Sequence, residues 1–126
     1  MRLVASIIVL IGLIISGGLW TNHALQISTD HLTRQIQQVN SEIKQDSWEA
    51  AGRQTIRLEK MWKKEAKWWP VVLDHQEMDN IDFSLARVKE YVASRNSSLA
   101  LGQLSEVKIM LEHIPKKEAV TLENIL

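Results

Sequence analysis

Cysteine is absent from this chain of 126 residues, and glycine and proline are scarce. The lack of cysteine excludes disulfide bonds and thiolate chemistry. Beyond Trp20 the chain has both of its prolines but only two of its five glycines. No stretch there alternates apolar and polar residues as a strand does, so we expect helices throughout.

An excess of charge of either sign is also missing. The chain carries 15 Lys and Arg against 15 Asp and Glu, so its formal net charge is zero. A nucleic-acid-binding protein needs a basic excess to displace counterions from phosphates. This composition therefore argues against nucleic acid as a partner.

One long apolar run stands near the N-terminus, LVASIIVLIGLIISGGLW, residues 3–20. A helix of this length covers ~27 Å, close to the hydrocarbon thickness of a bilayer. We expect residues 1–20 to form a transmembrane anchor that contacts lipid through residues 3–20. Arg2 and the free amino terminus precede it, which favours a cytoplasmic N-terminus and places residues 21–126 outside the cell membrane.

A cleaved secretory signal is the alternative, because the small residues Ser16, Gly17 and Gly18 follow the apolar run. Against it, there is no A-x-A pattern, the basic region is minimal, and Trp20 suits an interfacial anchor. We favour an uncleaved, single-pass anchor.

Four amphipathic segments follow the anchor. The first continues directly from it, because no helix breaker lies between Trp20 and Asp46. We expect the Ser47 hydroxyl to cap the second segment and Pro115 to end the fourth. The pattern predicts an all-α fold, in which an N-terminal transmembrane helix precedes an antiparallel bundle of about four helices. The apolar stripes consist of Leu25, Leu32, Ile36, Val39 and Ile43; Trp48, Ala51, Thr55, Leu58, Trp62, Ala66 and Trp69; Val71, Met78, Ile81, Leu85, Val88 and Val92; and Leu101, Leu104, Val107, Leu111 and Ile114.

Tryptophan is concentrated in residues 57–85, RLEKMWKKEAKWWPVVLDHQEMDNIDFSL. Trp48, Trp62 and Trp69 lie on the apolar stripe of the second segment, which predicts core positions for them. Trp68 lies off this stripe, so it either caps one end of the bundle or is an exposed contact residue.

A basic row follows the outer face of the second segment, and an acidic cluster opens the third. In an antiparallel hairpin these groups become neighbours, which suits both helix dipoles and favours solvent-exposed ion pairs. The alternative is a row that contacts anionic lipid head groups, wall polymers or an acidic partner. The row is Arg53, Arg57, Lys60, Lys64 and Lys67, and the cluster is Asp74, Glu77, Asp79 and Asp82.

His75 precedes Asp79 and Asp82 by four and seven residues. This spacing suits two ligands of Zn, Mn or Fe, yet a site needs three or four, and the remaining histidines are scattered. No nucleophile, oxyanion donor or Gly-rich loop stands beside these carboxylates, so we expect no enzyme activity and no cofactor. We expect His75 and Asp79 to hydrogen-bond to each other or to a tryptophan N–H.

The chain ends in KKEAVTLENIL, in which Leu122, Ile125 and Leu126 are large and apolar. Solvated ends seldom have this composition, so we expect this tail to pack back on the bundle or to insert into a partner.

The N-terminal span, the tryptophan spacing, the run HQEMDNID and the terminal LENIL together resemble the domain of unknown function 4363 family. These are small membrane-anchored proteins of spore-forming Gram-positive bacteria without an established activity. The resemblance also implies an association with genes for a multi-pass membrane protein. The residues that carry it are His75, Glu77, Asp79, Asp82, Asn124, Ile125 and Leu126.

These observations favour a non-enzymatic interaction or accessory subunit of a cell-envelope membrane complex, with a membrane protein as partner. The alternative is an extracytoplasmic bundle that senses a small ligand or metal and acts through a partner. The oligomeric state stays open. The candidate interaction residues are Trp68, Trp69, His75, Glu77, Asp79, Asp82, Asn124, Ile125 and Leu126.

Overall fold

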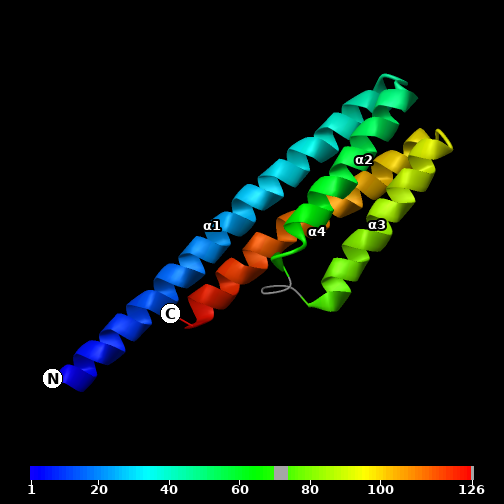
Figure 1. Cartoon of the computed structure of the whole chain (residues 1–126). Coiled ribbons are helices and arrows are strands. Elements are labelled where there is room, and N and C mark those ends of the chain that lie inside the picture. The colour runs from blue at the N-terminus through cyan, green and yellow to red at the C-terminus, as the bar shows by residue number, and fades with distance from the viewer. Residues whose placement is uncertain (70–73, 126) are drawn as a thin grey trace.

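The computed structural model describes residues 1–69 and 74–125, the last nine of these by their backbone only. It contains four helices: α1 (Arg2–Lys44), α2 (Trp48–Glu65), α3 (His75–Ala93) and α4 (Ser97–Ile125). Each helix packs antiparallel against the next, and α4 closes the bundle against α1 (Figure 1). The described residues contain no strand, and the all-α expectation is confirmed.

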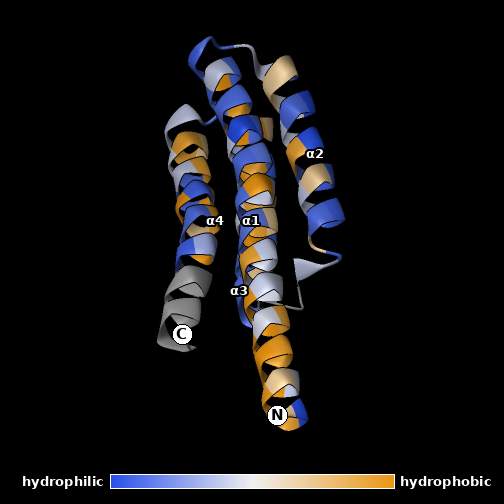
Figure 2. Cartoon of the chain, turned by 90° about the vertical axis from the view of Figure 1, so that its left-hand side faces the viewer, coloured by the Kyte–Doolittle hydropathy of each residue, from blue (hydrophilic) through white to orange (hydrophobic). Residues whose placement is uncertain are grey.

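Helix α1 is 43 residues long and runs without a break from Arg2 into the bundle, as expected. Its N-terminal part is apolar and unburied, and it stands clear of the other helices (Figure 2). Within the described residues, α1 is the one helix long and apolar enough to cross a membrane. We call the end of the bundle nearest Trp20 the Trp20 end, and the opposite end the far end.

Two tight turns of similar geometry close the far end. Asp46 and Arg95 have left-handed φ angles of 58° and 56°. The N–H of Ser47 donates to the carbonyl of Glu42 and that of Asn96 to Tyr91, each at 2.9 Å, as in a Schellman motif. Ser47 holds the N-cap position, but its side chain makes no capping bond, so that expectation is wrong. Its ψ of 70° differs from the extended backbone that aims a capping hydroxyl at the first turn.

Pro115 lies inside α4, so the expectation that it ends the helix is also wrong. Proline lacks the N–H that would bond to the carbonyl four residues earlier, and the loss of this hydrogen bond destabilises the helix locally. Ile114 and Pro115 are both buried in the bundle, and this tertiary packing outweighs the local cost.

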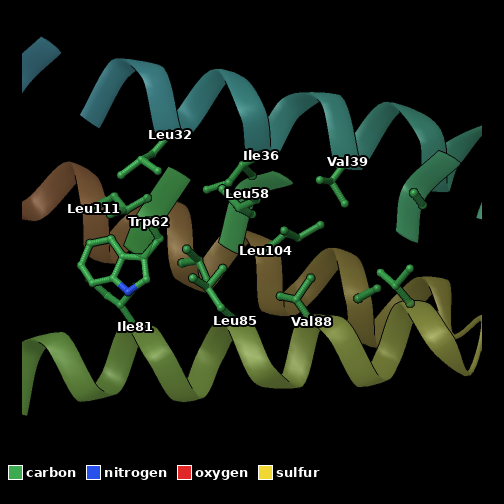
Figure 3. Close-up of a cluster of buried hydrophobic side chains, with 14 of the residues drawn as sticks. Leu32, Ile36, Val39, Leu58, Trp62, Ile81, Leu85, Val88, Leu104 and Leu111 are labelled. Carbon is green, nitrogen blue, oxygen red and sulfur yellow. The ribbon is translucent and has the colours of Figure 1, made fainter. Parts of the chain in front are cut away.

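The four predicted apolar stripes meet in one core. Leu32, Trp62, Ile81 and Leu111 approach one another from the four helices, and the layers continue toward the far end (Figure 3). Of the expected core residues, Val71 lies outside the described residues. The buried core comprises Leu25, Leu32, Ile36, Val39, Ile43, Ala51, Leu58, Trp62, Trp69, Ile81, Leu85, Val88, Val92, Ala100, Leu104, Val107, Leu111 and Ile114.

Candidate interaction surface at the Trp20 end

The corner between α2 and α3 lies at the Trp20 end, and its two tryptophans have different surroundings. Trp69 is fully buried and its ring meets that of Trp62 edge-on, with centroids 5.1 Å apart. Trp62 is 2% exposed, so the core positions expected for these two residues are confirmed. Trp48, at the far end, is half-buried and packs against the core from its edge.

Trp68 is half-buried and fixes the end of α2. Its indole Nε1 donates to Oε2 of Glu65 at 3.1 Å. The same oxygen accepts from the hydroxyl of Ser28 on α1 at 2.8 Å. Trp68 therefore belongs to a polar link between α1 and α2, and its half-buried ring corresponds to the first of the two positions considered for it, a cap at one end of the bundle.

An apolar groove with a volume of about 660 Å³ lies beside this link. Trp20 is 72% exposed and Ile27 44% exposed along it, so both present apolar area to solvent. This groove is not among the features predicted from the sequence, although the four- and three-residue steps from Trp20 through Ala24 to Ile27 mark a second apolar stripe on α1. The groove is lined by Trp20, Thr21, His23, Ala24, Ile27, Ser28, His31, Glu65 and Trp68.

The acidic cluster at the start of α3 is arranged differently from the expectation. Asp74 caps the helix, because its Oδ1 accepts from the backbone N–H of Glu77 at 2.8 Å. His75 and Asp79 are exposed, and no hydrogen bond joins them in the described part of the chain. Solvent hydrates both side chains, so that expectation is wrong. Of the acidic residues in the cluster, Asp82 is the one that bonds to a tryptophan: its Oδ1 accepts from Nε1 of Trp62 at 2.6 Å.

The basic row of α2 faces outward, as expected, with all five side chains exposed. Two ion pairs on α2 and α3 join Glu59 to Lys63 at 3.4 Å and to Lys89 at 3.3 Å. Burial raises the pKa of Glu59, but the hydrogen bonds and charges of Lys89 and Lys63 outweigh this, and the pKa lies below its ordinary value. Lys89 therefore links α3 to α2 midway along the hairpin.

No three His, Asp or Glu side chains among the described residues gather closely enough to hold a metal ion. Three of the predicted interaction residues lie at the C-terminus. The side chains of Asn124 and Ile125, and all of Leu126, lie outside the described residues.

The backbone of α4 nevertheless shows where the tail goes. Leu111 lies near Leu32 of the antiparallel α1 (Figure 3). Both helices rise equally per residue, so Ile125, fourteen residues further along α4, comes level with Gly18. The helix therefore extends beyond the α2–α3 corner toward the apolar part of α1, as Figure 1 shows.

A family model described as "Domain of unknown function (DUF4363)" matches residues 19–125. The chain belongs to this family. The matched region contains the whole bundle and the C-terminal part of α4, and it omits most of the apolar segment. No curated protein and no solved structure matches the chain. Membership confirms the resemblance in the sequence and carries no activity with it.

Proposed function

We propose that the chain is a membrane-anchored, non-enzymatic interaction subunit, with its N-terminus in the cytoplasm and its bundle outside. In this proposal the Trp20 end binds a membrane-protein partner of the cell envelope. The observation that carries it is the gathering of Trp68, His75 and the C-terminal turns of α4 at the end of the bundle next to the apolar segment. A surface placed there meets other membrane proteins directly.

Two tryptophans provide a matched test of the partner site. Trp68 and Trp48 are both half-buried but lie at opposite ends of α2. The tagged full chain should co-purify a membrane protein from solubilised membranes, Trp68→Ala should lose it, and Trp48→Ala should retain it. A purification that returns this chain alone, or equal losses for both variants, would contradict the proposal.

The C-terminal turns allow a second test of the same proposal. A chain that ends after Thr121 lacks the apolar residues of the tail but keeps the bundle core. We expect it to lose the partner while its thermal unfolding in mild detergent changes little. Unchanged partner binding would show that the residues after Thr121 do not belong to the binding site.

The proposed orientation has a simple chemical test, because the chain contains no cysteine. Gln26 is exposed at the Trp20 end. A membrane-impermeant maleimide should label Gln26→Cys in intact cells. Labelling only after lysis would place the bundle in the cytoplasm.

Ligand sensing is a second candidate function, favoured by a hollow of about 360 Å³ between α2 and α3. Pockets for small molecules have volumes of this order. Lys63 and Lys67 line it together with the carboxylates Glu59 and Asp82. Lys63 is paired with Glu59, so Lys67 is the lysine that a small organic acid would contact. A panel of carboxylic acids should then raise the melting temperature, and Lys67→Gln should abolish the rise.

A further inference from the structure

The groove at the Trp20 end has the shape of a helix-binding surface. From Trp20 to His31 it follows α1 for twelve residues, or ~16 Å, with the end of α2 as its wall. Trp20, Ala24, Ile27 and His31 line it at steps of four, three and four residues. This is the spacing by which one helix packs along another in a coiled coil.

The same spacing continues into the apolar segment. Going back from Trp20, the next positions are Gly17 and Leu13, and the run of steps is four, three, four, three and four. A Cβ added at Gly17 would meet no atom within 4 Å, so the chain's own fold does not require glycine there. We call these six residues the α1 seam: Leu13, Gly17, Trp20, Ala24, Ile27 and His31.

An occupant of this groove must leave the bilayer parallel to α1 and present apolar residues both below and above Trp20. Helix α1 itself has these properties. We infer that the α1 seam binds the α1 seam of a second copy, as a parallel helix pair. The inference needs α1 to span a membrane. It does not need the proposed membrane-protein partner, which would contact Trp68, His75 and the C-terminal turns of α4 and not the α1 seam.

The residues that flank the seam support self-association. In a parallel pair, a residue that directly precedes every second seam residue, such as His23 before Ala24, meets the residue five positions further along on the partner helix. His23 of the second copy would thus approach Ser28, which bonds to Oε2 of Glu65. The other oxygen of Glu65, Oε1, has no donor among the described residues, so an imidazole N–H can donate to it. Asp30 is the one formally charged residue at the flanking positions 14, 16, 21, 23, 28 and 30, so charge repulsion between the two helices is small.

Cysteine crosslinking of the full chain in native membranes tests the inference, because the natural sequence has no cysteine. Ile27 lies on the seam, whereas its neighbour Gln26 is exposed but turned ~100° further round the helix, away from the groove. Under mild oxidation, Ile27→Cys and Ala24→Cys should give at least ~10-fold more disulfide-linked dimer than Gln26→Cys, because a disulfide requires Cα atoms within about 7 Å.

A second variant separates association from folding. Ile27→Lys in the Ala24→Cys chain should lower the crosslinked dimer at least ~5-fold, since a charge would enter the seam. Its circular dichroism should stay helical, because Ile27 is 44% exposed in the single chain. Equal dimer yields at positions 26 and 27 would overturn the inference. So would the absence of dimer at 24 and 27, as a lipid in the groove predicts, or a crosslink to a different protein.

Discussion

The two ends of the bundle are built in different ways. The far end has two three-residue turns of matching backbone geometry, one between α1 and α2 and the other between α3 and α4. The Trp20 end has a longer corner, the four tryptophans Trp20, Trp62, Trp68 and Trp69, an apolar groove and two helices that extend past it. Local backbone bonds close the far end, whereas side chains with exposed apolar area form the Trp20 end. In the proposed function, the first end provides structural closure and the second provides recognition.

Among changes that test this difference between the ends, removal of the Trp62 side chain should lower the free energy of unfolding most. Trp62→Ala should destabilise the chain by about 3–5 kcal/mol, because a buried ring and its edge-on contact with Trp69 are lost. Thermal unfolding in mild detergent measures the change. A loss below ~1 kcal/mol would mean that the Trp20 end is not held by its aromatic core. Trp48→Ala serves as the control, because Trp48 is a half-buried tryptophan at the far end.

Asp82→Ala should cost less, about 1–2 kcal/mol. It leaves the Nε1 proton of Trp62 without its carboxylate acceptor in a nearly buried position. Asp82→Asn keeps a neutral acceptor and should lose less stability than Asp82→Ala. In a Trp62→Phe background, which has no N–H to pair, Asp82→Ala should have almost no effect, and an undiminished loss there would assign it to another contact.

At the far end, two substitutions by glycine should raise the stability of the chain. Arg95→Gly should stabilise the chain by about 1 kcal/mol, because glycine adopts the left-handed φ of 56° without a Cβ penalty. Asp46→Gly should act in the same sense at the other turn, with its φ of 58°. Denaturant unfolding checks both. A loss of stability would show that the two side chains do more than close turns.

The smallest expected effect on stability concerns the ion pairs of Glu59, which lie midway between the two ends of the bundle. The pKa of Glu59 is lowered in the folded chain, so its stabilisation is present above its ordinary pKa and is lost as the pH falls through the folded value. Lys89→Met should remove about 0.2–1 kcal/mol at neutral pH. The difference from the natural chain should vanish in acid, and a difference that persists at pH 2 would have another cause.

Periodicity in the sequence predicted the parts of this fold that depend on which face of a helix is apolar. The four stripes and the outward basic row follow from residues spaced three and four apart, and the continuous α1 follows from the absence of a helix breaker between Trp20 and Asp46. The errors concern contacts whose partners are distant in sequence or depend on one dihedral angle. Pro115 stays helical because of burial, and Ser47 fails to cap because of its ψ angle.

The candidate surface was predicted in part, for a similar reason. The position of Trp68 off the core stripe follows from its spacing, whereas its bond to Glu65 and the link to Ser28 require α1 and α2 to be placed side by side. Ile27 has the character of a core residue in the sequence. Only the packed bundle shows that its side chain borders a groove.

The unbroken course of α1 gives the molecule a mechanical property. With no flexible joint at Trp20, the apolar segment and the bundle turn together as one stiff lever. The 25 residues from Trp20 to Lys44 make an arm of ~36 Å. If α1 spans a membrane as proposed, its tilt adjusts to the thickness of the bilayer, and a change of about 10° would swing the far end sideways by ~6 Å.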